Sequence, residues 1–236
     1  MSSATRANGA RFRVSHLWLP TLAFVAAFAG LEHSRFDVAV TGSFYDPAIR
    51  DFPAREGWWA KELVHEYGRA LIIGVIIAAA IAWLASRLSP ALAPLRRPAT
   101  YVLAVYAVVN LATFAGQQLT NVQCPWKLAM FGGDRPYVRL LEPRRPRVHA
   151  GHCFPGRHSS GGFALFAFYF LWRHSHPSAA RAALAGALTL GSVFALAQWM
   201  RGAHFPSHDL WSAWLCWMWA LALDRVLLRA PRVRDG

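Results

Sequence analysis

Long apolar stretches separated by short polar and basic turns dominate this sequence. A stretch of about 20 apolar residues is long enough to cross the hydrocarbon core of a bilayer, which is roughly 30 Å thick. We expect membrane-spanning helices near residues 17–31, 69–85, 100–118, 159–172, 182–200 and 210–228. The pattern therefore predicts an all-α fold, a six-helix transmembrane bundle.

The polar segments set the expected organisation around these spans. Residues 1–15 are polar and basic, and we expect them to form a disordered cytoplasmic tail. One membrane domain would cover residues 16–229, and residues 230–236 would form a second cytoplasmic tail. Residues 58–67 are amphipathic and could lie in the membrane interface. The longest late polar segment, residues 119–158, would join the third and fourth spans.

The distribution of basic residues predicts the orientation. Six spans place both termini on one side, together with the turn at residues 86–98 and the loop at residues 173–181. These segments are short and basic, so the positive-inside rule makes that side cytoplasmic. The first apolar run lacks a convincing cleavage site and would serve as an anchor. We therefore expect a multi-pass protein of a bacterial-type inner membrane, with its long loop facing outward.

Composition narrows the class of partner. The chain is 55% hydrophobic, above the usual share for a soluble domain, and its formal charge is +13. The arginines lie between apolar segments, so we assign the charge to topology and to contacts with anionic membrane lipids, not to nucleic acid. A GC-rich genome is an equally good explanation for most of these arginines. The outward loop is itself basic, with Arg139, Arg144, Arg145 and Arg147 among its residues. An anionic ligand would explain that, although long loops can be translocated whatever their charge.

Three clusters of residues could carry chemistry, and the predicted topology places all three at the outer face. The first surrounds a glycine pair with Lys127 and Arg135. Cations beside glycines can surround a phosphate, although a run of this kind is more often a solvated loop.

The second cluster directly precedes the fourth span and contains Gly156, Arg157 and His158. The start of a helix favours anions, because its backbone N–H groups are free. Ser159 or Ser160 could cap that helix. A single histidine at such a position is usually only a capping or interfacial residue.

The third cluster is a polar turn before the last span, with Arg201, His204, His208 and Asp209 around Pro206. A carboxylate beside an imidazole fixes the imidazole tautomer and stabilises its cation. A neutral imidazole can attack phosphorus and form a phospho-histidine. Ionisable residues at a membrane face are functional-site candidates by default.

The order of these clusters resembles the type 2 phosphatidic acid phosphatase superfamily. That family has a Lys…Arg-Pro motif, then Pro-Ser-Gly-His, then Ser-Arg…His…Asp, on a six-helix membrane bundle. The resemblance covers roughly residues 124–214. It implies that Lys127 and Arg135 bind phosphate, that His158 protonates the leaving group, that His204 is the nucleophile and that Asp209 is its partner acid. It implies no metal and no other cofactor.

The sequence departs from the family motifs at four places. Seven residues separate Lys127 from Arg135, where the family has six. Gly156 and Arg157 replace the usual Ser and Gly; the Gly156 backbone could still donate to phosphate, and Arg157 could add a contact. Gln198 stands where the third motif has Arg, and Arg201 could substitute. His208 stands at the fourth position after His204 and Asp209 at the fifth, so either could orient His204.

The resemblance implies hydrolysis of a lipid phosphate or pyrophosphate, such as phosphatidic acid, phosphatidylglycerol phosphate, undecaprenyl pyrophosphate or lipid A. A phosphotransferase of the same architecture, which passes the phosphate to a second lipid, is an alternative. A non-catalytic lipid-binding protein or transporter is another, although the chain shows no internal repeat. The oligomeric state is not determined by the sequence. Cys124 and Cys153 bracket the outward loop, so a disulfide between them is an open possibility.

Overall fold

The structure, a computed structural model, describes residues 9–142 and 151–229. The proposed tail at residues 230–236 and most of the N-terminal tail lie outside these ranges, as do Arg144, Arg145 and Arg147. Within them the chain is helical and forms no strand, apart from two isolated β-bridges. The all-α prediction is confirmed for the described part.

Four helical stretches are long and apolar enough to cross a membrane, counted over the described residues: Gly9–His33, Pro53–Leu88, Pro90–Leu119 and Pro177–Met200. They contain α2 (Leu19–His33), α4 (Gly68–Leu88), α5 (Arg96–Leu119) and α8 (Pro177–Met200). Leu71, Ile77 and Ile81 of α4 are among the large apolar side chains exposed on their surfaces. Such faces suit lipid as the solvent. The chain is therefore a membrane protein.

The other two expected spans are shorter helices of the bundle. The fourth is divided into α6 (Arg157–Phe163) and α7 (Phe166–Trp172), and the sixth is α9 (Pro206–Leu223) followed by the π-helix η7 (Asp224–Leu228). Small residues allow α6 to pack tightly against α8: a Cβ on Gly162 would lie 2.8 Å from the Cα of Gly191. The exact count of six crossings stays a prediction.

The N-terminal segment differs from the expectation of disorder where it is described. Residues 9–13 are helical and continue into the π-helix η1 (Val14–Trp18). The ring of Phe12 stacks on His16, with centroids 4.3 Å apart, and the guanidinium of Arg173 lies 4.1 Å from its centre. These contacts order a segment whose polar composition alone suggested a tail.

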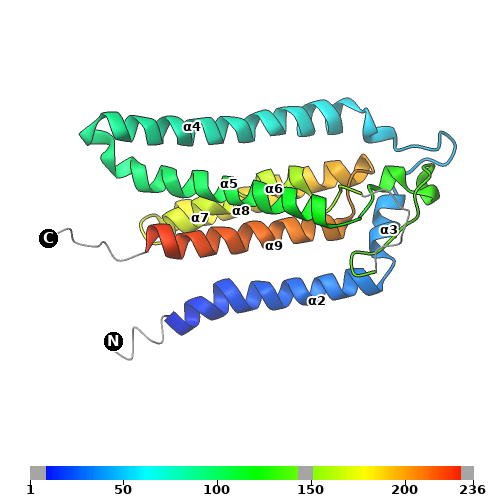
Figure 1. Cartoon of the computed structure of the whole chain (residues 1–236), viewed down its shortest axis with the longest axis horizontal. Helices are drawn as coiled ribbons and strands as arrows, with labels where there is room; N and C mark the ends of the chain where they lie inside the picture. The colour runs from blue at the N-terminus through cyan, green and yellow to red at the C-terminus, as the bar shows by residue number, and fades with distance from the viewer. Residues whose placement is uncertain (1–8, 143–150, 230–236) are drawn as a thin grey trace.

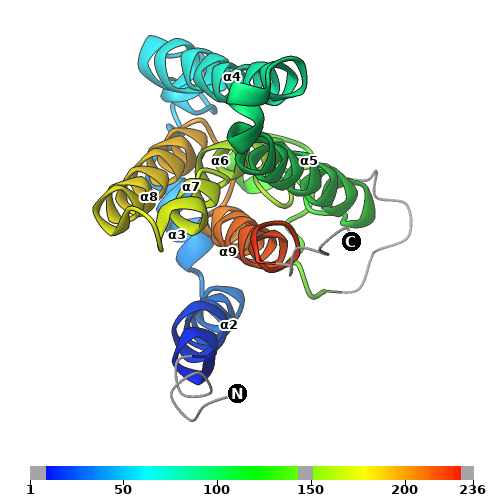
Figure 2. The same cartoon turned by 90° about the vertical axis from the view of Figure 1, so that its left-hand side faces the viewer.

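The described ends of the chain meet at one end of the bundle, and the loops that carry the three motifs lie at the other (Figure 1). Seen end-on, α5 to α9 form the centre, with α4 on one side and α2 on the other (Figure 2). The main core contains Tyr101, Phe163, Phe170 and Phe194. A smaller apolar cluster of Phe52, Leu128, Phe131 and Phe205 supports the loops.

Two short elements connect the loops to the bundle. The helix α3 (Phe36–Gly42) carries the buried Asp37, whose Oδ1 accepts the backbone N–H of Ser207 at the start of α9 over 3.0 Å. The π-helix η3 (Trp59–Tyr67) runs directly into α4. The amphipathic residues 58–67 therefore extend the second span instead of forming a separate interfacial helix.

Candidate active site

His204 and Asp209 form a buried pair where α8 turns into α9. Nδ1 of His204 lies 3.0 Å from Oδ1 of Asp209, and their side chains are 10% and 2% exposed. Pro206 begins α9, so Asp209 lies in the first helical turn and faces back toward the preceding loop. Because Asp209 accepts from Nδ1–H, it leaves the Nε2 lone pair of His204 for a substrate.

Two further donors hold the Asp209 carboxylate. The hydroxyl of Ser159 donates to Oδ1, and the indole N–H of Trp199 donates to Oδ2 over 2.6 Å. The expectation that Ser159 or Ser160 caps α6 is wrong, because Ser159 binds Asp209 while Ser160 donates to the Gly156 carbonyl. A carboxylate with several donors keeps one orientation, and so does the imidazole that it contacts.

His158 lies in the first turn of α6 and faces the same space as His204. Its ring stacks on Phe194, with centroids 4.4 Å apart, and lies beside His65 at 4.5 Å. Its Nε2 is buried and has no hydrogen-bond partner in the part of the chain that the structure describes. A buried polar atom without a partner is costly, so a ligand that binds Nε2 would remove that cost.

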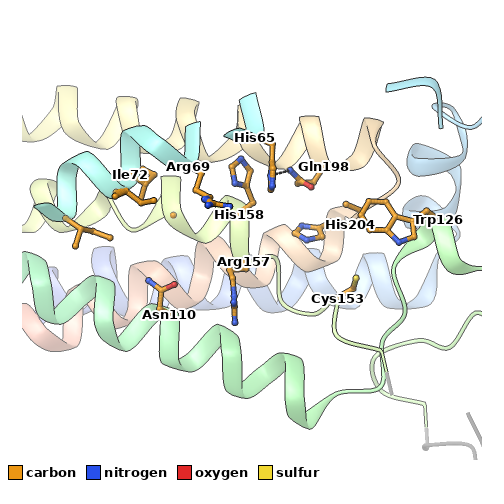
Figure 3. A pocket seen from close by; sticks show the side chains of 14 residues that line it. His65, Arg69, Ile72, Asn110, Trp126, Cys153, Arg157, His158, Gln198 and His204 are labelled. Carbon is orange, nitrogen blue, oxygen red and sulfur yellow. Dashed lines mark hydrogen bonds between the residues drawn. The ribbon is translucent and has the colours of Figure 1, made fainter. Parts of the chain in front are cut away.

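A cavity of about 420 Å³ joins these histidines, and Figure 3 shows its lining. His65, Arg157, His158, Gln198 and His204 give one part of it a polar wall. Ile72, Ile73 and Ile76 of α4 make another part apolar. In Figure 3, Ile72 lies on the side of His158 that is away from His204. The cavity can therefore accommodate an amphiphilic molecule.

Gly156 allows the second and third clusters to meet. Its N–H donates to the His208 carbonyl over 3.3 Å, and its carbonyl accepts from the Ser212 hydroxyl over 2.8 Å. A Cβ at this position would lie 2.1 Å from Oδ1 of Asp209 and 2.7 Å from Nδ1 of His204. The replacement of Ser by Gly in the second motif therefore has a steric reason.

His208 and Arg201 take other positions. The ring centroids of His208 and His204 are 5.9 Å apart, and His204 is hydrogen-bonded to Asp209 and not to His208. Of the two alternatives, the geometry favours Asp209 as the orienting group. Arg201 donates from Nε to the Arg55 carbonyl over 3.1 Å and does not line the cavity. Burial lowers the pKa of Arg201.

The first cluster lies outside the cavity lining. The Lys127 carbonyl accepts the N–H of Arg135 over 2.8 Å, and Nε of Arg135 lies 3.2 Å from Oδ1 of Asp134. Neither Lys127 nor Arg135 lines the cavity, so their phosphate-binding roles stay predictions. Arg157 does line it, but its guanidinium lies 5.6 Å from the centre of the Phe114 ring and in Figure 3 points away from His158.

A disulfide closes the loop beside the site. Cys124 and Cys153 are bonded, with a Cα–Cα distance of 5.2 Å across 29 positions of sequence. The backbone N–H of Cys153 also donates to the Val122 carbonyl. Cys153 lines the cavity, so the disulfide fixes one of its edges.

Sequence reasoning missed His65, Trp126 and Trp199. His65 comes from η3, Trp126 lines the cavity from the loop, and Trp199 binds Asp209. One signal could have found His65: it is an ionisable residue where an amphipathic segment enters an apolar span. The two tryptophans carry no comparable signal, because aromatic residues are common at membrane interfaces.

A comparison with protein families found a match. A model of the PAP2 superfamily matches residues 98–231, which is more than half of the chain. The chain belongs to the PAP2 superfamily. The match includes His158, His204 and Asp209, whereas α2, α3, η3 and α4 precede it. No curated protein and no solved structure matches the chain. Membership of this superfamily favours phosphatase or phosphotransferase chemistry.

Proposed function

We propose that this protein hydrolyses a lipid phosphate or pyrophosphate through a phospho-histidine formed on His204. The observation that supports this most directly is the His204–Asp209 pair, whose histidine lines the same cavity as His158. The family assignment supports phosphoryl transfer, and the pair would supply an oriented nucleophile for it.

Two steps account for hydrolysis. Nε2 of His204 attacks phosphorus, the bond from phosphorus to the leaving oxygen breaks, and His158, in its protonated form, donates a proton to that oxygen. Water then attacks the phospho-histidine and the P–N bond breaks, with His158 taking a proton from the water. This restores the neutral imidazole of His204 and the protonated His158, and it releases inorganic phosphate. The oriented carboxylate of Asp209 stabilises the cationic imidazole in each step.

The apolar part of the cavity supports a lipid as the substrate. Ile72, Ile73 and Ile76 offer no donor or acceptor to a soluble sugar or nucleotide, whereas they can contact an acyl or isoprenoid chain. The phosphate would then lie between His158 and His204, with the chain directed along α4. The proposed location is a bacterial-type inner membrane, with the site on the extracytoplasmic face.

The test is phosphate release from a panel of lipid phosphates by the full chain in detergent, with EDTA present. We expect EDTA-resistant release from the native protein and from His33→Ala, which removes an exposed histidine at the end of α2. His204→Ala should reduce release by at least about 10⁴-fold, as loss of a nucleophile does in other covalent mechanisms.

Other outcomes would change the assignment. Transfer of labelled phosphate to a second lipid without release would make the protein a phosphotransferase. Neither release nor transfer on a broad panel would favour a non-catalytic lipid-binding protein. Release that EDTA abolishes would contradict the histidine mechanism.

A further inference from the structure

One wall of the cavity comes from a segment that the family model does not cover. The match begins at residue 98, whereas η3 and α4 contribute His65, Arg69 and Ile72 to the lining. Figure 3 shows His65 beside Gln198 and above His158. The site is therefore built partly by residues for which the family match assigns no role.

His65 is held in place by contacts with two other helices and with the residue that follows it in η3. Its Nδ1 lies 3.1 Å from Nε2 of Gln198 in α8, and its ring lies beside His158 of α6. Its Nε2 is 3.8 Å from Oε1 of the neighbouring Glu66. A Cβ on Gly68 would lie 2.6 Å from the Phe194 ring, so a glycine is needed for η3 and α4 to approach α8 this closely.

Each arginine of the cavity lining has a contact of its own. The Arg69 side chain is 65% exposed and lies 4.0 Å from Oε2 of Glu66. The Arg157 guanidinium faces the Phe114 ring. His65 and Gln198 are the polar residues of the lining that are bonded to each other, and His65 lies directly beside His158. The Gln198 amide has two N–H groups, and one of them is used by Nδ1 of His65.

We propose that His65 and Gln198 together form a phosphate-binding element of this site, in which His65 orients the Gln198 amide so that its second N–H donates to a phosphate oxygen. His65 is a positioning residue in this arrangement and also forms the wall beside the bound anion. The inference rests on the proposed function, because it assumes that a phosphate binds between His158 and His204.

The experiment measures binding of inorganic phosphate, so it does not depend on turnover. Phosphate that binds the folded protein raises its Tm, and the dependence on concentration gives a Kd. We expect His65→Ala to weaken phosphate binding about tenfold or more. Without His65 the Gln198 amide is no longer oriented, and its hydrogen bond to the charged phosphate is lost. Glu62→Gln, on an exposed side chain of the same helix, is the matched control and should bind as the native protein does.

A second substitution separates binding from packing. In the double variant His65→Ala with Gln198→Arg, a guanidinium at the same wall supplies rigid donors that need no orienting partner. We expect it to restore phosphate binding to within about threefold of the native Kd. Unchanged binding in His65→Ala, or no recovery in the double variant, would overturn the inference. If the native protein releases phosphate from lipids but shows no response to inorganic phosphate, the inference is overturned and the proposed function stands.

Discussion

At the scale of single residues, the site depends on a glycine at position 156, where a side chain would not fit. Gly156 is the residue where the backbone before α6 approaches the His204–Asp209 pair. The family resemblance would place Ser there, yet Asp209 already receives a hydroxyl from Ser159, three residues further along. A serine at residue 156 would therefore crowd the carboxylate without adding a donor that it lacks.

We predict that Gly156→Ser, although it restores the family pattern, reduces kcat/KM about 100-fold. The new Cβ would displace Asp209 or His204, and a misplacement of about 1 Å can have an effect of that size. Gly74→Ala, where no atom lies within 4 Å of the added Cβ, should leave the rate unchanged. The measurement is steady-state phosphate release by the purified variants. Native-like kinetics for Gly156→Ser would show that the pair tolerates displacement.

At the scale of elements, α3 holds the start of α9. Asp37 is 7% exposed and accepts the Ser207 N–H, two residues before Asp209. This bond caps a helix from a residue 170 positions away in sequence. Burial raises the pKa of Asp37, and the Ser207 contacts oppose that shift. The orientation of Asp209 therefore depends on a short helix outside the family match.

We predict that Asp37→Ala lowers the free energy of unfolding by about 0.5–2 kcal/mol, the usual effect of losing a helix cap, and also lowers activity. Asp37→Asn keeps a carbonyl acceptor and should retain most of the activity.

Because the folded pKa of Asp37 is raised, protonation favours the folded state. The native protein should therefore gain stability relative to Asp37→Asn as pH falls through that pKa. Denaturant unfolding in detergent at several pH values measures both effects, and equal stability of all three proteins would show that the cap contributes nothing.

At the scale of the whole molecule, the two ends of the bundle differ in chemistry. The end with the motif loops holds the cavity and the disulfide. At the opposite end, the buried Asp224 contacts the buried Arg173 at 2.7 Å and the partly exposed Arg229 at 2.8 Å. Arg87, Arg96 and Arg97 lie at the same end, in or near the turn between α4 and α5. The connections at this end, called the basic end below, are short and rich in arginine, which is why the proposed orientation makes it cytoplasmic.

We predict that a membrane-impermeant maleimide labels Met130→Cys in intact cells and labels Ala93→Cys only after permeabilisation. Both positions are exposed, Met130 in η6 (Ala129–Phe131) near the motif loops and Ala93 in η4 (Pro90–Leu95) near the basic end. The native cysteines should give little background, because two are bonded and Cys216 is buried. The reverse labelling pattern would place the site on the cytoplasmic side.

The sequence alone determined the apolar helices, their approximate limits and the three clusters, because span length and local motifs are properties of contiguous residues. Only the tertiary structure placed the clusters relative to one another. It selected Asp209 over His208 as the partner of His204, and it left Lys127 and Arg135 outside the cavity lining. It also brought His65 and Asp37 to the site from residues that precede the family match. Contacts between residues 133 or 170 positions apart depend on how helices pack, and no local pattern in the chain records them.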